Sequence, residues 1–386
     1  MSFLLKELKE NNVGISLAES GLKVKFNGSV LPHALINKVK ENKAALVEYL
    51  GRLNGERVEI DIKKVVSHDG YPLSSCQRRV WILSQYEQGN VAYNMPGACV
   101  LEGQLHRESL AYAADALIAR HESLRTVFRE DVQGEVRQFI CPPAELQFAI
   151  AQQRVPNAGE LRRLVGEEFA RPFNLAAGPL LRISLFESGD GAWVLAYVMH
   201  HIISDGWSLN ILRDEMLLLY NAHRQGRQNP LPPLRIQYKD YAVWQQSYLR
   251  GDALAAHRAY WLRQFAGNLP VLELAKSKLR PAVRTYNGRA ITRRVRSAPG
   301  EGLKAALQQH GSSLFMGLLS VVYALLHKHT GAEDIIIGSP IAGREHMDLE
   351  NQIGFYANTV ALRTRFGAGY NFRQLLEAVR KTTLDA

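Results

Sequence analysis

The sequence has few of the residue patterns that hold metals, nucleotides or redox cofactors. Its three cysteines, Cys76, Cys99 and Cys141, are far apart and form no CxxC pair. This spacing and the odd count favour reduced thiols in a core over disulfides or a zinc site. Glycine-rich phosphate loops and HExxH motifs are also absent. We therefore expect no bound cofactor or metal, and no nucleotide, redox or zinc-protease chemistry.

Long apolar segments are missing as well. The longest stretch near the C-terminal third without a charged residue or histidine, Gly311 to Leu326, is shorter than the ~18 to 20 apolar residues that cross a bilayer. It predicts a buried helix instead. The N-terminus, MSFLLKELKENN, mixes acids and bases and has no apolar signal core. These features predict a cytoplasmic protein without a membrane partner.

Acidic residues are absent from one strongly basic segment. Eight lysines and arginines lie between Lys276 and Ser297, and they supply most of the net charge of +10. Nucleic-acid-binding segments interleave aromatic residues with basic ones, and only Tyr286 is present here. We therefore do not expect nucleic acid as a partner. A solvated strand face with its loop is the favoured interpretation, and a docking patch for an acidic protein is the alternative.

The residues that are present predict a folded protein of several parts. The 386 residues are 46% hydrophobic and 22% charged, which fits about two or three domains of ~150 residues each. Residues 1–55 show the order helix, hairpin, helix, helix, and in the second strand Lys23 and Lys25 alternate with apolar residues up to Phe26. So small a unit has little core, and an apolar face left over predicts an interaction module. Residues 56–70 are interpreted as a linker.

Helical and strand patterns alternate from residue 71 onward. One helix is expected to start near Ser74 and another to be centred on Leu110 to His121. Further helices are expected at Glu160 to Phe169, around Leu209 to Leu219, at Ser313 to Leu326 and, with Asn371 as its cap, at the C-terminus. The expected strands are Leu181–Phe186, the almost wholly apolar Ala192–Met199, Ile335–Gly338 and Thr359–Arg363. These patterns predict an α/β (α+β) fold with two comparable lobes, residues 71–232 and 233–386.

The segment HHIISDGWS, residues 200–208, carries the chemistry. It begins where the apolar strand ends and stops where a helix begins, a favoured place for a functional site. Because neighbouring strand residues point to opposite faces, only one of His200 and His201 can face a given cavity. Asp205 and Gly206 predict a tight turn whose amides point into that cavity at the helix N-terminus. Taken alone, such a segment is structural more often than catalytic.

The segment resembles the HHxxxDG motif of condensation domains of non-ribosomal peptide synthetases, within the acyltransferase superfamily that includes chloramphenicol acetyltransferase. Further segments are similar to the other motifs of that family, in the same order: YPLSSCQRRVWIL (71–83), RHESLRTVF (120–128), YKDYAVW (238–244), IGSPIAGR (337–344) and IGFYANTVALR (353–363). The first 55 residues resemble, by pattern, the docking domains that precede condensation domains in tubulysin-type synthetases. The resemblance implies two chloramphenicol-acetyltransferase-like lobes forming a V with a tunnel between them. It also implies that the second lobe is incomplete at Ala386 and that an α-β-β-α-α docking domain precedes both lobes.

The resemblance implies amide bond formation between two thioesters on the phosphopantetheine arms of donor and acceptor carrier proteins. His201 then faces the tunnel and acts on the acceptor amine, His200 points away, and Gly206 offers its amide to the oxyanion. Asp205 is expected to be structural and to pair with Arg125.

The resemblance also suggests roles for residues around this centre. The candidates for the tunnel or substrate contacts are Trp207, Ser208, Ser75 and Asn358, with plain packing as an equal alternative for Trp207 and a helix-cap role for Ser208. The candidates for docking the C-terminal tail of an upstream synthetase are Lys23, Val24, Lys25 and Phe26, through strand addition.

Three other interpretations compete with this one. An epimerisation domain shares the histidine motif, but the docking unit and the sequence IISDGWS favour condensation. A heterocyclisation domain replaces the motif with an aspartate-based one and is disfavoured. A fragment that only docks carrier proteins, and is catalytically inert because its second lobe is incomplete, remains an alternative from a different class.

Overall fold

The computed structural model divides the chain into two compact units, Met1–Asp61 and Ile62–Ala386, and each is described by itself. The structure describes residues 8, 13–18, 21–26, 33–43, 46–47, 61–66, 68–85, 91–189, 191–250, 252–274, 288, 290–293, 297–367 and 369–386.

The first unit contains the hairpin and a helix that the sequence predicts. Strands β1 (Val13–Ala18) and β2 (Gly21–Phe26) pair antiparallel, and helix α2 spans His33–Glu41. Leucines and valines from these elements and their neighbours form its small core: Leu8, Val13, Leu35, Val39 and Leu46. The expected helices before β1 and after α2 lie almost wholly outside the described residues.

A four-stranded sheet organises the first part of the second unit, in the order β4-β9-β8-β7. Its strands are β4 (Asn94–Leu101), β7 (Ala151–Val155), β8 (Leu181–Ser188) and β9 (Trp193–His200). Only the β7–β8 pair among them is parallel. β9 lies inside the sheet, which confirms the strand predicted at Ala192–Met199. Its apolar composition suits a position between two neighbouring strands.

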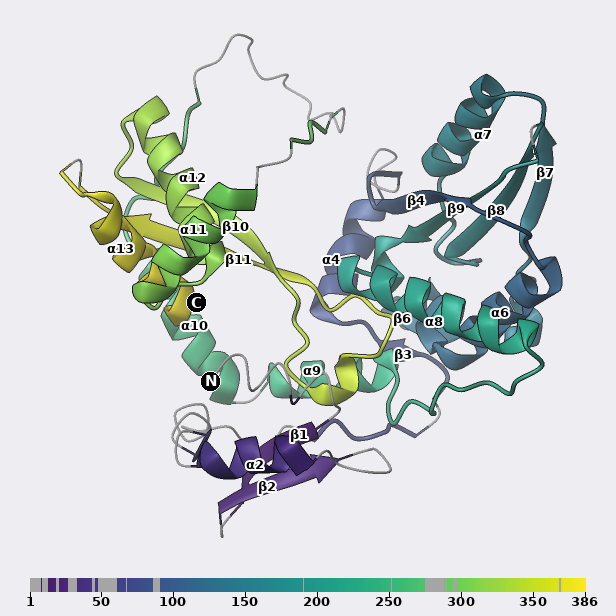
Figure 1. The fold of residues 1–386 in the computed structure, drawn as a ribbon, viewed down its shortest axis with the longest axis horizontal. Helices are drawn as coiled ribbons and strands as arrows, with labels where there is room; N and C mark the ends of the chain where they lie inside the picture. The colour runs from purple at the N-terminus through teal and green to yellow at the C-terminus, as the bar shows by residue number, and fades with distance from the viewer. Residues whose placement is uncertain are drawn as a thin grey trace. The chain divides into compact units, whose positions relative to one another are not determined.

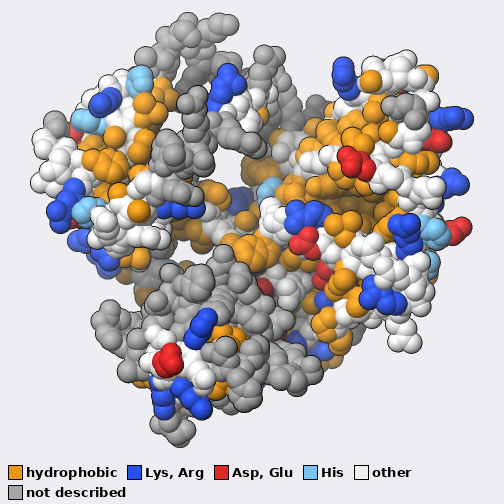
Figure 2. Space-filling view, in the orientation of Figure 1, with side chains coloured by type: hydrophobic (Ala, Val, Ile, Leu, Met, Phe, Trp, Pro, Cys, Tyr) orange, Lys and Arg blue, Asp and Glu red, His pale blue; other side chains and the backbone are white. Residues whose placement is uncertain are grey.

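Helices cover both faces of this sheet. α6 (Arg107–Arg120) and α8 (Gly206–Arg224) lie side by side, and their leucines share one core with β8 and β9 (Figure 1). α7 (Ala158–Ala170) packs on the opposite face against Phe186 and Ala196. Figure 2 shows hydrophobic side chains gathered over the β4, β8 and β9 region, where Val100 of the edge strand is 63% exposed.

A three-stranded sheet and a short helix complete this part. The sheet has the order β3-β6-β5, with β3 (Tyr71–Pro72), β5 (Thr126–Glu130) and β6 (Val136–Ile140). α4 spans Ser75–Ser84, as predicted, and begins at a capping box formed by Ser74 and Gln77. Short 3₁₀ turns are η1 (Glu122–Arg125), η2 (Pro143–Glu145), η3 (His201–Ile203) and η4 (Met347–Leu349).

The rest of the second unit is mainly helical. Its helices are α9 (Tyr238–Tyr248), α10 (Asp252–Gln264), α11 (Ser297–Gln309), α12 (Leu314–Thr330) and α13 (Phe372–Asp385). Strands β10 (Asp334–Ile341) and β11 (Asn358–Arg365) pair antiparallel and pack against α12 and α13. The segment between these strands reaches the N-terminus of α8 (Figure 1), where it contributes to the site described below.

The prediction of a buried helix at Gly311 to Leu326 is wrong for one face of α12. Tyr323 and Leu319 are buried against β10, β11 and α13, as the prediction requires. Six apolar residues are nevertheless 38 to 53% exposed: Leu314, Phe315, Leu318, Val321, Val322 and Leu325. Apolar composition predicts the helix, but only tertiary contacts decide how many of its faces are covered.

The cysteines do not all lie in a core. Cys76 is buried, but Cys99 is exposed because it lies on the edge strand β4. The prediction that all three thiols occupy a core is therefore wrong.

Among the described residues no single helix has the length and apolar composition to cross a membrane. Residues Gly302–Gln309 and helix α12 together reach that length and apolar composition, but the chain bends by 98° between them. The boundary predicted between two lobes near residue 232 stays a prediction.

Candidate functional site

The two histidines stand in different environments. β9 ends at His200, whose side chain is fully buried and whose Nδ1 accepts a hydrogen bond from the Ile202 amide at 3.2 Å. The ring meets Phe173 edge-on, with 5.9 Å between centroids. His200 therefore closes the turn from inside the core.

His201 begins η3 and is only partly buried. Its backbone amide donates to the Tyr93 carbonyl at 2.8 Å, and its ring lies 4.5 Å from the Phe355 ring, centroid to centroid. Neither imidazole nitrogen has a hydrogen-bond partner among the described residues, and Nδ1 is the buried one of the two. Nε2 is thus the nitrogen available to a substrate.

Asp205 holds the turn together. It is 1% exposed and caps α8, because its Oδ1 accepts from the Ser208 amide at 2.8 Å. Its Oδ2 accepts from the amides of Tyr356 and Ala357, at 3.1 and 3.3 Å. Its charge partner is Arg344, with 3.1 Å between Nη2 and Oδ1. The expected structural role of Asp205 therefore fits its surroundings.

The predicted pairing of Asp205 with Arg125 is wrong. Arg125 ends η1, lies 3.6 Å from the carboxylate of Glu122, and donates to the Cys141 carbonyl at 2.9 Å. These contacts hold Arg125 beside β6. The arginine that neutralises Asp205 comes instead from the segment between β10 and β11.

Arg344 binds several groups at once. Its Nη2 donates to Ser208 Oγ at 2.8 Å, and its Nη1 donates to the carbonyls of Leu349 and Gln352. Its guanidinium also lies 4.2 Å from the ring centroid of Tyr356. The preceding Gly343 has φ +63°, and a Cβ there would lie 2.2 Å from the Tyr356 carbonyl oxygen, so only glycine fits. Sequence reasoning matched this segment to a motif but gave Arg344 no role.

The residues after Asp205 differ in exposure. Gly206 is the first residue of α8, so its N–H has no acceptor within the helix, and a Cβ added there would meet nothing within 4 Å. Trp207 is 44% exposed and its Nε1 donates to the Glu350 carbonyl at 3.0 Å. Ser208 is fully buried, 2.9 Å from the Gly354 carbonyl. The helix cap is Asp205, so the cap role expected of Ser208 is wrong.

The candidates Ser75 and Asn358 lie on the two chain segments that meet beside this turn. Ser75 is exposed and its amide donates to the Gln245 side chain at 2.8 Å, whereas the preceding Ser74 is fully buried and lies 2.7 Å from Tyr238 Oη. Asn358 is exposed, and its Oδ1 accepts from Arg79 at 3.4 Å. The docking candidates Lys23, Val24, Lys25 and Phe26 all lie on β2, but their side chains lie outside what the structure describes.

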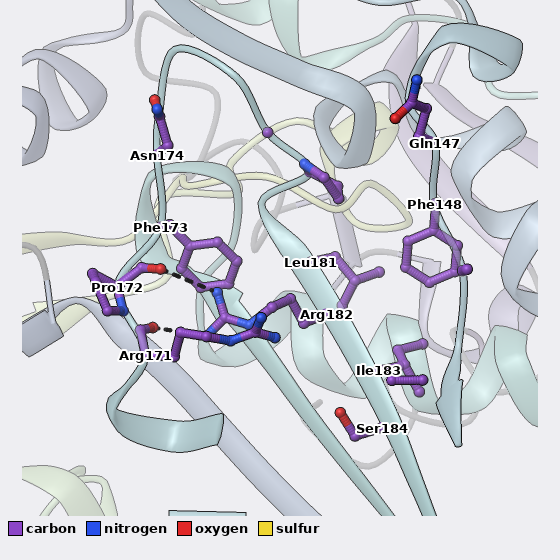
Figure 3. Close-up of a pocket in the computed structure, with 14 residues that line it drawn as sticks. Gln147, Phe148, Arg171, Pro172, Phe173, Asn174, Leu181, Arg182, Ile183 and Ser184 are labelled. Carbon is purple, nitrogen blue, oxygen red and sulfur yellow. Dashed lines mark hydrogen bonds between the residues drawn. The ribbon is translucent and has the colours of Figure 1, made fainter. Parts of the chain in front are cut away.

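A cavity of 360 Å³ lies near His200 rather than His201, since Phe173 lines it. Figure 3 shows Arg182 laid over the Phe173 ring, with 3.8 Å between Cζ and the ring centroid. The same guanidinium donates to the carbonyls of Glu168 and Arg171, at 3.1 and 2.8 Å. Burial first, and then the charge of Arg171, lower the pKa of Arg182 to about 10. The last carbonyl groups of a helix have no hydrogen-bond donor within it, and Arg182 supplies donors to carbonyls at the C-terminal end of α7. Arg182 is therefore best explained as a structural residue.

A buried ion cluster ties the β10–β11 segment to α6 and α8. The Glu215 carboxylate accepts from Arg120 Nε at 3.1 Å and lies 2.7 Å from His121 Nε2. On the other side of the ring, His121 Nδ1 accepts from the Ile353 amide at 3.3 Å. Burial, the largest cause, lowers the pKa of His121 although Glu215 acts in the opposite direction. The two hydrogen bonds require a neutral ring with its proton on Nε2.

This cluster predicts acid sensitivity. Because the pKa of His121 is lower in the folded chain than its ordinary value of 6.5, the unfolded chain binds a proton here first as pH falls. The stability that the neutral ring contributes is present above about pH 6.5 and is lost below it, by at most about 1.4 kcal/mol per pH unit. We expect urea unfolding to show that the free energy of unfolding falls less between pH 7.5 and pH 5.5 in His121→Asn than in the parent. The exposed His310, changed to Asn, is the control, and equal losses in all three proteins would contradict the assignment.

The comparisons with known proteins agree with this fold. A family model described as "Condensation domain" matches residues 67–386, so the chain belongs to the condensation domain family.

Among curated proteins the chain is similar to long synthetases. It is 43% identical over 327 residues to a plipastatin synthase protein of Bacillus subtilis (strain 168), covering 84% of this chain and 9% of that protein. It is 42% identical over 325 residues to tyrocidine synthase 3 of Brevibacillus parabrevis, covering 84% and 5%. The chain therefore spans about a tenth or less of the length of these relatives.

Solved structures show the same fold. The X-domain from teicoplanin biosynthesis aligns with a TM-score of 0.74 at 26% identity, over 84% of this chain and 73% of that one. The first condensation domain of the calcium-dependent antibiotic synthetase, in complex with a substrate analogue, aligns with a TM-score of 0.67 at 24% identity, over 82% and 73%. The second likeness concerns the fold alone.

Proposed function

We propose that residues 62–386 form an amide bond between a donor acyl or peptidyl thioester and an acceptor aminoacyl thioester, both carried on phosphopantetheine arms of carrier proteins. Membership of the condensation domain family supports this proposal. The observation that carries it is the state of His201: a partly buried imidazole, directly after the central strand, whose Nε2 no described residue occupies.

In this reaction the acceptor amine nitrogen attacks the donor thioester carbon, the carbon–sulfur bond breaks, and the donor thiol leaves with a proton. His201 Nε2 hydrogen-bonds and orients the amine, and it takes the amine proton as the tetrahedral species forms. The Gly206 N–H, at the open start of α8, donates to the oxyanion, which is worth ~3 kcal/mol in comparable sites. His200 supports the turn from inside.

The test is product formation by the isolated chain. Purified protein is incubated with a donor-loaded and an acceptor-loaded carrier protein, and the acceptor is analysed by mass spectrometry for the mass of the joined product. An amide on the acceptor carrier supports the proposal. Carrier binding without product supports the inert docking platform instead, and an inverted donor stereocentre without an amide supports an epimerisation domain.

We also propose that residues 1–55 dock the C-terminal tail of an upstream synthetase. β2 pairs only with β1 among the described residues, so its other edge has no described partner strand. An extended peptide can add to such an edge through its backbone. Lys23 and Lys25 are two residues apart on this strand and pair with Ser16 and Gly14 of β1. Residues 1–57 contain nine basic and six acidic residues, so this part of the chain carries a net positive charge. This charge favours an acidic tail.

Docking led by charge predicts a salt-dependent affinity. For a fluorescently labelled acidic tail peptide, we expect the binding free energy to weaken by roughly 0.5 to 2 kcal/mol between 50 and 500 mM salt, as exposed ion pairs are screened. The double variant Lys23→Glu, Lys25→Glu should lose this dependence. The double variant Lys40→Glu, Lys43→Glu, which changes two exposed lysines at the end of α2 and just after it, is the control for net charge. An affinity unchanged by salt argues against charge-led docking.

A further inference from the structure

No residue that the structure describes hydrogen-bonds to the imidazole of His201. A catalytic histidine is commonly held in place by a carboxylate or carbonyl on the nitrogen that faces away from the substrate. Here Nδ1 is buried, and no described residue hydrogen-bonds to it. What contacts the ring is aromatic: Phe355 at 4.5 Å and Tyr93 at 6.3 Å, measured between centroids. The angle between the rings of His201 and Phe355 is 59°.

Phe355 is itself fixed to the turn that carries His201. It is 5% exposed, and the residues on both sides of it are bonded to the first turn of α8. The Gly354 amide donates to Ser208 Oγ at 3.1 Å, and the Tyr356 amide donates to Asp205 Oδ2 at 3.1 Å. These bonds attach the backbone around Phe355 to the turn that carries His201, although the two residues are far apart in the sequence.

Tyr238 fixes the same segment from the other side. Its hydroxyl donates to the Phe355 carbonyl at 2.6 Å and lies 2.7 Å from Ser74 Oγ, the cap of α4. Its ring lies against Gly354 so closely that a Cβ there would be 2.1 Å from Tyr238 Cδ2. One buried hydroxyl thus links α9, α4 and the backbone of Phe355.

We propose that Phe355 is a positioning residue that sets the orientation of the His201 imidazole, and that Tyr238 holds Phe355 in that position. The proposal rests on the proposed function, in which Nε2 of this ring meets the acceptor amine. Packing replaces the hydrogen bond that usually orients such a ring, and it leaves both nitrogens free of protein partners among the described residues. Because the contact is not polar, a change of ring at position 355 alters the orientation of His201 without removing a charge.

The first test measures the ring directly and needs no substrate. Diethyl pyrocarbonate modifies accessible neutral imidazoles, and peptide mass mapping gives the rate at His201 relative to the exposed His310 in the same sample. An aromatic contact of this kind changes the equilibrium between the packed and the unpacked ring by a factor of about two to ten. We therefore expect Phe355→Leu and Tyr238→Phe to raise the modification rate at His201, relative to His310, by about two- to tenfold.

The matched control is Tyr241→Phe. This change also deletes one hydroxyl from a buried tyrosine of α9, but that hydroxyl bonds to the Gln245 side chain and not to Phe355. We expect it to leave the relative rate at the parent value. If Phe355→Leu fails to fold, Tyr238→Phe, which removes one oxygen, decides the result alone. Rates at His201 that stay at the parent value in every folded variant overturn the proposal.

The second test separates positioning from general stability. With loaded carrier proteins, we expect Phe355→Leu and Tyr238→Phe to lower kcat by about tenfold while KM for the acceptor carrier stays within about twofold, since misorientation acts on the reacting atoms. A rise in KM alone overturns the positioning role. If the modification rates change as expected but the parent forms no amide, the positioning stands and the proposed function fails.

Discussion

Replacing Arg344 by methionine is expected to lower the free energy of unfolding by about 3 to 5 kcal/mol. The Arg344 side chain is 2% exposed and its partner Asp205 is 1% exposed. Water therefore cannot solvate the charge that remains in the folded chain when its partner is removed. The variant leaves the Asp205 carboxylate buried with only its neutral donors. It also removes the donor that Arg344 supplies to the carbonyls of Leu349 and Gln352. Urea unfolding followed by tryptophan fluorescence measures the loss.

A double-mutant cycle separates the ion pair from its surroundings. Asp205→Asn removes the other charge, and the double variant should lose less than the sum of the two single variants, because it leaves no uncompensated charge. The matched control is the exposed pair Arg373 and Glu377, 3.3 Å apart and 68% and 63% exposed. Arg373→Met should cost less than about 1 kcal/mol. If Arg344→Met were as mild as this control, the buried pair would not be what holds the segment on α8.

Elements that depend on local signals are the ones that the sequence predicts well. Asn371 caps α13, Gly331 ends α12 at φ +71°, and the helix expected from Ser74 begins there. Each of these depends on a side chain bonding to backbone a few residues away, or on a glycine that tolerates a positive φ. The apolar strand before His200 is predicted from a different local signal, its short and almost uninterrupted run of apolar residues.

The partner of Asp205 could not be found in this way. Arg344 lies 139 residues from Asp205 along the chain, and no local pattern ranks it above Arg125. One signal was available: Arg344 is the only charged residue of IGSPIAGR, and an arginine in an otherwise apolar segment tends to be buried with a partner. Similarly, the spacing of Ser74 and Gln77 is that of a capping box and points to Ser74 as the buried serine, one residue before the candidate Ser75.

The largest effect on activity is expected at His201. His201→Ala should fold normally, because the ring is partly exposed and its nitrogens make no hydrogen bond to a described residue that the change would break. Product formation should fall by ~10²- to 10⁴-fold, the usual contribution of a positioned acid or base. The acceptor α-amine, with an ordinary pKa of ~7.7 to 8.0, is already partly neutral at physiological pH. What the variant loses is therefore chiefly the orientation of the amine and the acceptance of its proton.

His200→Ala provides the contrast, since the two residues are neighbours in the sequence but not in role. Its ring is fully buried against Phe173, and its removal leaves the Ile202 amide without its acceptor. We expect this variant to lose stability, by about 2 to 4 kcal/mol, before it loses chemistry. Circular dichroism and unfolding curves measure the first effect, and the carrier-protein assay measures the second. An unchanged product yield in a folded His201→Ala variant would remove His201 from the mechanism, and a loss of product confined to His200→Ala would exchange the roles of the two rings.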